Sequence, residues 1–312
     1  MKLGADKFGG VRDVSATSRE RRDNYRQNVR YRFGAIADLY YAYWGEFFHL
    51  AVFEEGDDPT DFDAALARTH ERYFAAIGGP EAGRILELAS GGGAFSEWMA
   101  ERTRGEVLGV DISDAQLAHA RGRLARRPRT NLRFVEHDIM DIAELDEPTF
   151  DAAICLDAAC YLPDKRAALR GIATRLRRGG RLLLVDWCRA ERPTELQEEL
   201  VLEPFYHYWG IPEMETTSGY RRACDVAGFR ILELEDLSSR VMPNWERGYR
   251  AANRALAEAL TPAKLLTVAA GVVRNGPRAM RLAKDQFYAA LFAKAAADAG
   301  LLRYVYLLAE RS

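Results

Sequence analysis

Four carboxylic acids stand inside or directly after predicted strands in the first half of the chain: Glu87, Asp111, Asp138 and Asp157. A carboxylate inside a strand, such as Glu87, is costly to bury unless another group pairs with it. Asp111 is placed to accept hydrogen bonds from ribose hydroxyls, and Asp138 could accept one from an adenine amino group. Asp157 could act as a general base or stabilise a cation, with the capping of a following helix as an equally weighted alternative. Together these acids indicate a nucleoside site beside a reacting centre.

A glycine-rich turn separates Glu87 from the next predicted helix. The turn contains Ala89, Ser90, Gly91, Gly92 and Gly93. Glycine allows positive φ angles and a close approach of the backbone to a ligand. A strand, a glycine turn and a helix open the βα unit of nucleotide-binding proteins. The acid at Asp111 suits either NAD or S-adenosylmethionine (SAM), so an NAD-dependent oxidoreductase remains an alternative at this point.

The elements that position these residues alternate along the centre of the chain. Short apolar runs predict strands at 84–88, 106–111, 132–136, 150–157, 181–187, 229–234 and 302–309. Helical spacing predicts helices at 94–100, 114–125, 167–178 and 219–228. This alternation predicts an α/β protein with a doubly wound sheet that helices cover on both faces.

These motifs resemble the class I SAM-dependent methyltransferases over roughly residues 80 to 190. The resemblance rests on Glu87-x-x-x-Gly91-x-Gly93, Gly109 to Ser113, His137-Asp138 and Phe150 to Asp164. It implies a seven-stranded, mostly parallel Rossmann-like sheet whose last strand is antiparallel, with an α-helical cap. It also implies SAM as the cofactor and S-adenosylhomocysteine (SAH) as the product. The acid within the first strand agrees, because SAM presents an ammonium group and a sulfonium rather than a pyrophosphate.

The sequence departs from the family pattern at two positions. Ala89 stands where the family usually has its first glycine, and Tyr161 stands where many relatives carry a histidine. The first change should tighten the turn without abolishing it. The second removes any role that the resemblance would give to that histidine.

The resemblance also implies which residues contact the cofactor. They are Glu87, Ala89, Ser90, Gly91, Gly93, Asp111, Ile112, Gln116, Asp138, Ile139 and Leu156. Methylation of carbon would need a base or a carboxylate that stabilises a cation. Asp157, His49 and Tyr161 are the catalytic candidates, with His207 as a further one. Methylation of an amine or a hydroxyl would need less.

Two aromatic segments lie outside these motifs. The first ends a predicted helix from Arg19 to Phe48, and its Trp44-Gly45-Glu46-x-x-His49 stretch resembles a segment of the tocopherol, sterol and isoprenoid methyltransferase group. We expect it to form a lid whose aromatic faces stabilise a cation in a dry site. Packing in the core, with a structural His49, is the alternative. The second aromatic segment is Phe205 to Trp209. The predicted substrate pocket combines the two segments, and its residues are Trp44, Phe48, Tyr206, His207 and Trp209.

Proline and glycine breaks and the order of the predicted elements divide the chain into three regions. Residues 1–79 form an N-terminal helical lid, and residues 80–243 with 301–312 form the SAM-binding core. Residues 244–300 are helical and alanine-rich, and they form a cap inserted before the last strand.

Composition excludes several other classes of protein. Lysine and arginine total 44 and aspartate and glutamate total 46, a balance that argues against a dedicated nucleic-acid-binding protein. The stretch after Leu156 also lacks the Pro-Pro pair of DNA amino-methyltransferases. The four cysteines have no metal-ligand spacing, so no metal site is predicted. No apolar signal sequence is visible, and the apolar run 265–273 is too short to cross a bilayer. We therefore expect a cytoplasmic protein without membrane insertion. The sequence leaves open whether it forms a homodimer.

The function that follows is SAM-dependent methyl transfer to a lipophilic small molecule, such as an isoprenoid or another specialised metabolite. The resemblance to the sterol group favours carbon as the acceptor atom. The alternatives are an N- or O-methyltransferase, or a cyclase that binds SAM without transferring its methyl group. Glu87 and Asp138 disfavour the NAD-dependent oxidoreductase.

Overall fold

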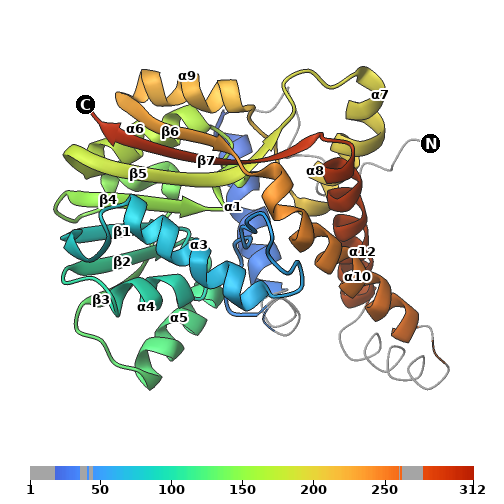
Figure 1. Ribbon diagram of the computed structural model, residues 1–312, viewed down its shortest axis with the longest axis horizontal. Coiled ribbons are helices and arrows are strands. Elements are labelled where there is room, and N and C mark those ends of the chain that lie inside the picture. The colour runs from blue at the N-terminus through green and yellow to red at the C-terminus, as the bar shows by residue number, and fades with distance from the viewer. Residues whose placement is uncertain (1–17, 36–40, 42–44, 260, 262–276) are drawn as a thin grey trace.

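The molecule is built on one seven-stranded sheet with the strand order β3-β2-β1-β4-β5-β7-β6 (Figure 1). The computed structural model describes residues 18–35, 41, 45–259, 261 and 277–312. The strands are β1 (Arg84–Leu88), β2 (Glu106–Asp111), β3 (Leu132–Glu136), β4 (Phe150–Leu156), β5 (Leu176–Arg189), β6 (Phe229–Asp236) and β7 (Leu302–Arg311). β1 to β5 are parallel, whereas β7 runs antiparallel to both β5 and β6. The predicted seven-stranded, mostly parallel sheet with an antiparallel last strand is confirmed.

Helices cover both faces of the sheet, as the alternation of elements predicts. One face carries α3 (Phe62–Ala76), α4 (Ala94–Ala100) and α5 (Asp114–Arg126), and the other carries α6 (Lys165–Arg175) and α9 (Thr217–Ala227) (Figure 1). Short 3-10 helices lie between them: η2 (Gly79–Glu81), η3 (Ile139–Glu144) and η4 (Ala159–Tyr161). The central strands are almost fully buried, because helices exclude water from both of their faces.

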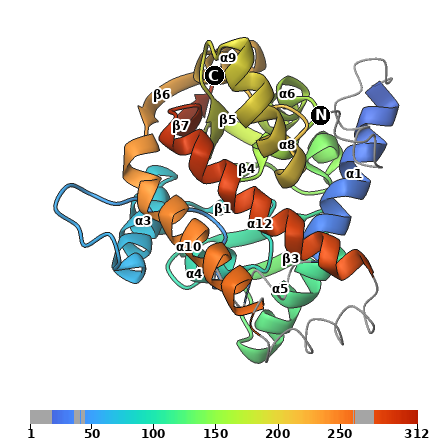
Figure 2. The ribbon, with the colours of Figure 1, turned by 90° about the vertical axis from the view of Figure 1, so that its right-hand side faces the viewer.

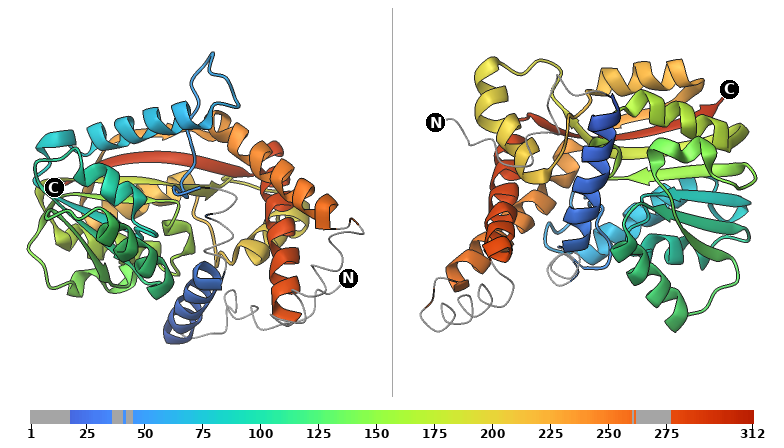
Figure 3. Two further views of the ribbon diagram at one scale, coloured as in Figure 1. Left: turned by 90° about the horizontal axis from the view of Figure 1, so that it is seen from below. Right: turned by 180° about the vertical axis from the view of Figure 1, so that it is seen from behind.

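A second group of helices lies beyond the carboxyl ends of the parallel strands. It contains α1 (Ser18–Ala35), α7 (Glu195–Gln197), η5 (Glu198–Leu202), α8 (Glu203–Trp209), η6 (Ser238–Val241), α10 (Met242–Ala259) and α12 (Pro277–Asp298). Figure 2 shows α10 and α12 crossing in front of this edge, and Figure 3 shows α1 on the opposite side of the same opening. α10 and α12 interrupt the chain between β6 and β7, where the sequence predicts a helical insertion. The division into lid, core and cap remains a prediction. No helix among the described residues is long and apolar enough to cross a membrane.

Two predicted boundaries are wrong. The helix predicted to reach Phe48 does not do so, because residues 45–53 have no helical structure. Their backbone donors bond instead to other parts of the molecule, as Val52 N does to Thr69 Oγ1 (2.8 Å) and Phe53 N does to Arg240 O (2.9 Å). The helix predicted to end at Arg178 ends at Arg175, since Leu176 already pairs with Phe150 at the start of β5.

Candidate functional site

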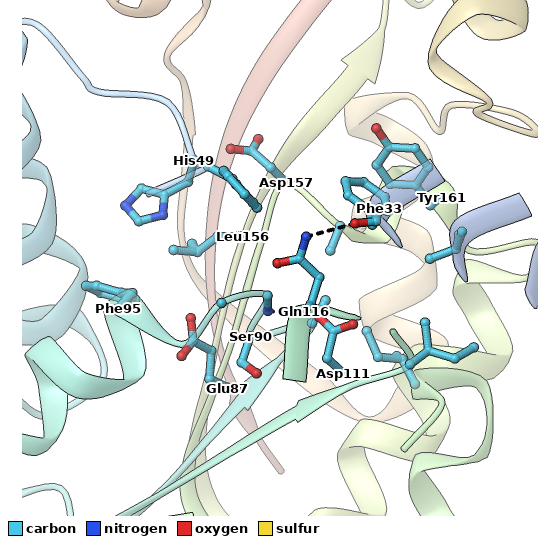
Figure 4. A pocket seen from close by; sticks show the side chains of 18 of the residues that line it. Phe33, His49, Glu87, Ser90, Phe95, Asp111, Gln116, Leu156, Asp157 and Tyr161 are labelled. Carbon is cyan, nitrogen blue, oxygen red and sulfur yellow. Dashed lines mark hydrogen bonds between the residues drawn. The ribbon is translucent and has the colours of Figure 1, made fainter. Parts of the chain in front are cut away.

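A cavity of about 1140 Å³, counted with the open space at its mouth, lies at the carboxyl edge of the sheet (Figure 4). It is at the point where the chain, having moved outward through β2 and β3, returns to β4 on the other side of β1. Ligands of doubly wound proteins bind at such a switch point. Its walls come from α1, residues 46–49, the turn after β1, the ends of β2, β4 and β5, and α8.

The turn after β1 has the left-handed backbone that its glycines predict. Gly91 and Gly93 have φ angles of 53° and 75°, and Ala89 has 56° although it carries a side chain. A Cβ at position 93 would overlap the ring of Phe134 and the methyl group of Ala120. Gly93 therefore lets α4 pack closely and does not line the cavity, whereas Ala89, Ser90 and Gly91 do.

Glu87 and Asp111 bring two shielded carboxyl groups to this turn. Glu87 is 6% exposed and accepts a hydrogen bond from Ser96, and burial raises its pKa to about 8. Asp111 accepts from the backbone N–H groups of Gly91 (2.8 Å) and Ser113 (2.8 Å). Burial raises the pKa of Asp111 to about 6, although these N–H groups act in the opposite direction. Each Asp111 oxygen keeps a lone pair for a ligand hydroxyl.

The remaining predicted cofactor residues divide into two groups. Ile112, Gln116, Ile139 and Leu156 line the cavity. Gln116 Nε2 donates to Phe33 O (3.1 Å), which joins α5 to α1. Asp138 does not line the cavity, because its carboxylate caps η3 through Met140 N (2.9 Å) and pairs with Arg26 Nε (2.7 Å). Its predicted contact with an adenine amino group is therefore taken by α1 in this structure.

Asp157 directly follows β4 with a φ of 51°, a conformation that is uncommon for a residue with a side chain. Its Oδ2 accepts hydrogen bonds from Leu50 N (3.1 Å) and Tyr304 Oη (3.1 Å). Its Oδ1 is shielded from solvent. Desolvation and then the charge of Asp186 raise the pKa of Asp157 well above its usual range, whereas hydrogen bonds from Tyr304, Leu50 and Trp187 lower it.

His49 also lines the cavity, but one ring nitrogen is engaged elsewhere. His49 Nε2 lies 2.7 Å from Nε2 of His70 on α3, and both residues are buried. Burial lowers the pKa of His49 to about 3 and that of His70 to about 2, so both rings are neutral near pH 7. Sequence reasoning missed His70, whose signal is its four-residue spacing from the buried Phe74 on the same face of α3.

The third catalytic candidate, Tyr161, lines the cavity and meets Phe33 edge to face at a centroid distance of 5.4 Å. Of the predicted substrate pocket, Phe48 and Trp209 line the cavity, whereas Tyr206 and His207 do not. Trp44 lies outside the described residues.

Aromatic residues that the sequence did not single out complete this part of the cavity. Trp187 at the end of β5 packs against Trp209 (4.8 Å between centroids) and Trp245 (5.1 Å). Tyr25, Val29 and Phe33 recur every four residues on the cavity face of α1. That spacing is a signal that could have identified the face.

The cavity therefore has two unlike ends. The acidic end is formed by Glu87, Ser90, Asp111 and Gln116, and the aromatic end by Phe33, Tyr161, Trp187 and Trp209. Figure 4 shows the acids low in the cavity, with Asp157 above them and Phe33 and Tyr161 to one side. Such a site can hold a polar, partly cationic group at one end and an apolar group at the other, away from water.

Comparisons with known proteins agree with this architecture. Residues 86–182 match the family described as methyltransferase domain. A sterol 24-C-methyltransferase of Kluyveromyces lactis is 30% identical over 236 residues, which are 74% of this chain and 62% of that protein. The chain thus spans less than two thirds of that relative.

Solved structures with low sequence identity share the fold. The cyclopropane synthase MmaA2 of Mycobacterium tuberculosis has a TM-score of 0.75 at 14% identity, and covers 92% of this chain and 98% of its own. The [4+2]-cyclase SpnF has a TM-score of 0.72 at 20% identity, and covers 92% of this chain and 96% of its own.

Proposed function

We propose, from the premise that this chain contains a class I methyltransferase domain, that it transfers a methyl group from SAM to a lipophilic small molecule. The premise follows from the matched residues 86–182, the sterol methyltransferase relative and the sheet topology, and it confirms the resemblance seen in the sequence. The observation that carries the proposal is the cavity with its acidic end and its aromatic end. A cofactor fits the first and an apolar acceptor fits the second.

The residues of the acidic end fit SAM. Glu87 is a buried carboxyl group with Ser96 as its hydrogen-bond donor, so it would gain from an ammonium group beside it. Asp111 would accept from the ribose hydroxyls, and the buried Ser90 Oγ has no partner among the described residues. Ile112, Gln116 and Ile139 would flank the base. SAM supplies a methyl group on a positively charged sulfur, so the protein has mainly to align the reactants and exclude water.

The aromatic end fits an isoprenoid or another apolar acceptor, and we propose carbon as the methylated atom. The relative from Kluyveromyces lactis is named for methylation of a sterol carbon. Adding a methyl cation to a carbon–carbon double bond leaves a carbocation, which aromatic faces and a carboxylate stabilise. Asp157 lies between the two ends and is the group we assign to stabilise the cation or accept its proton. His49, neutral and bonded to His70, would shape the wall, and Tyr161 would face the acceptor.

The cofactor assignment is tested by calorimetric titration with SAM and, separately, with SAH. We expect micromolar binding to the wild type, weakened at least about tenfold in Asp111→Ala because the ribose hydroxyls lose their acceptor. Glu106→Ala is the matched control, since Glu106 opens the same strand but is exposed and far from the cavity. Absence of binding to well-folded wild type would contradict the proposal, and NADH fluorescence would then test the oxidoreductase.

The acceptor is tested with methyl-labelled SAM and a panel containing an unsaturated sterol, farnesol, a phenol and an aliphatic amine. Label on carbon of the sterol or of farnesol supports the proposal, and label on oxygen or nitrogen moves the assignment to an O- or N-methyltransferase. Binding of SAM without label transfer, together with a cyclised product, would indicate the cyclase alternative. A cytoplasmic location and a homodimer also belong to the proposal, and light scattering of the purified protein tests the latter.

A further inference from the structure

The carboxylate of Asp157 connects three segments that are far apart in the sequence. It directly follows β4, accepts from the backbone N–H of Leu50, and accepts from Tyr304 on β7. Both donors act on the same oxygen, Oδ2, at 3.1 Å each. A carboxylate held by two donors on one oxygen has a fixed orientation, and the Trp187 side chain acts as a third donor to the same carboxyl group.

Tyr304 is itself held rigidly at the point where the cap joins the sheet. Its side chain is 1% exposed, and it lies opposite Trp187 in the β5–β7 ladder. Its backbone N–H donates to Ser238 Oγ (3.0 Å), and its carbonyl accepts from Leu237 N (2.7 Å). These two bonds join the chain before α10 to the chain after α12. Tyr304 therefore cannot move without moving both ends of the helical insertion.

The second donor fixes the wall of the cavity. Leu50 follows Phe48 and His49, which both line the cavity. The next residue, Ala51, donates to Asn244 Oδ1 on α10 (3.1 Å) and accepts from Asn244 Nδ2 (2.8 Å). The stretch of chain that carries Phe48 and His49 is thus attached to Asp157 at Leu50 and to α10 at Ala51.

We propose that Tyr304 is a positioning residue for Asp157: its hydroxyl holds Oδ2 and fixes the orientation of the carboxyl group at the cavity wall. The inference rests on the proposed function, in which Asp157 stabilises a cation or accepts a proton. Leu50 N–H and the Tyr304 hydroxyl both donate to Oδ2, so together they fix the rotation of the carboxyl group. Loss of the Tyr304 hydroxyl frees the carboxyl group to rotate.

The surroundings of Asp157 decide how its ionisation responds. The titratable groups that act on it or feel its charge are Tyr73 on α3, Cys155 on β4, Cys160 on η4, Asp186 on β5 and Tyr304 on β7. Neutral His49 precedes the second donor in the chain. Burial and Asp186 favour the protonated carboxyl group, whereas the Tyr304 hydroxyl favours the ionised one. Removal of this hydroxyl must therefore raise the pKa of Asp157.

The test is an infrared titration of the protonated carboxyl band from about pH 4 to 10 on the full chain without ligand. The band of Asp157 is identified by its absence in Asp157→Asn. In Tyr304→Phe we expect its midpoint to rise by about one to two pH units, as loss of a hydrogen bond to a charged group requires. Tyr306→Phe is the matched control, because it removes a buried hydroxyl on the same strand and face that lies toward Glu233. Its midpoint should equal that of the wild type.

A second variant tests the opposite direction without removing any atom of the contact. Difluorotyrosine at position 304 is a stronger donor, so it should lower the midpoint of Asp157. An unchanged midpoint in Tyr304→Phe, an equal shift in Tyr306→Phe, or no titrating band lost in Asp157→Asn would each overturn the inference. The titration needs neither cofactor nor acceptor. A protein that titrates as expected but binds no SAM would contradict the proposed function alone.

Discussion

The two ends of the cavity are stabilised in different ways. At the acidic end, the ligand-facing groups lie on strand ends and one turn, and backbone N–H groups hold the carboxylate of Asp111. At the aromatic end, a ring of α1 packs edge to face on one of η4, and a ring of β5 packs edge to face on one of α8. The first is a backbone structure that tolerates little change in geometry, and the second is a packed surface that can be reshaped. The difference suits a cofactor of fixed structure and an acceptor that varies among related proteins.

The largest expected effect is at the rigid end. Gly93→Ala places a side chain at a φ of 75° and against Phe134, so we expect the free energy of unfolding to fall by about 2–4 kcal/mol. Urea denaturation measures it. Gly122→Ala on α5 is the control, since its Cβ meets nothing closer than Arg126 at 3.6 Å and a helical alanine should stabilise by about 1 kcal/mol. Equal changes in the free energy of unfolding of both variants would contradict the claim that position 93 requires glycine.

At the aromatic end, Trp209→Ala should lower the activity toward the acceptor and leave the affinity for the cofactor unchanged. We expect kcat/KM for the acceptor to fall at least about tenfold, because a large apolar contact is lost. Affinity for SAH should stay within about threefold. Tyr208→Ala on the same helix is the control, because Tyr208 stacks on Tyr288 and Phe292 and does not line the cavity. A matching loss of SAH affinity in Trp209→Ala would show that the two ends are not independent.

The buried carboxyl group of Glu87 at the acidic end should make the stability of the protein depend on pH. The pKa of Glu87 is raised from 4.5 to about 8 in the folded protein, so folding takes up a proton between these values. The resulting stability is present in full below pH 4.5 and is lost as the pH rises toward 8. Compared with Glu87→Gln, the ligand-free wild type should thus lose at least about 1 kcal/mol between about pH 5 and pH 8.

The affinity for cationic SAM should move in the opposite direction to this stability, because the ionised carboxylate is the form that binds a cation. Thermal denaturation and calorimetry across this pH range measure the two trends. Stability curves of wild type and Glu87→Gln that run parallel would contradict the shielded carboxyl group.

The smallest effect concerns the departure from the family pattern. Ala89 has a φ of 56°, so Ala89→Gly should relieve strain and raise the free energy of unfolding by about 0.5–1 kcal/mol. Ala118→Gly, in the exposed face of α5, should instead lower it by about 1 kcal/mol. Chemical denaturation of the pair gives the sign directly. A loss of stability in both would mean that the turn holds alanine without strain.

The sheet, and the placement of most acidic-end residues at one cavity, are predictable from the sequence because both depend on local signals. Glu87 to Gly92 and Asp111 to Gln116 are short stretches that both contribute residues to the same cavity from adjacent strand ends. Gly93 and Asp138, which the resemblance places at the cofactor, lie against Phe134 and Arg26 respectively and do not line the cavity. Those partners come from other elements, so no local pattern reveals them.

The aromatic end was only partly predictable for the same reason. Phe48 and Trp209 stood in conspicuous aromatic runs, whereas Trp187 and Phe33 are single aromatics whose place depends on how distant elements pack. The false extension of a helix to Phe48 has a similar origin. Asp157, Thr69 and Asn244 satisfy the backbone of residues 50–52, and these side chains are up to 193 positions away.

The position of β7 has a consequence for the order in which the molecule assembles. β6 pairs with β7, and β7 follows every other strand in the chain. During synthesis, β1 to β5 and their helices can therefore associate while β5 still has an unpaired edge and β6 has no partner strand. Tyr304 arrives with β7, so Asp157 gains its hydroxyl partner only in the final step of sheet completion. A ribosome-bound chain that stops before β7 would already have the residues of the acidic end, but not the oriented carboxylate beside it.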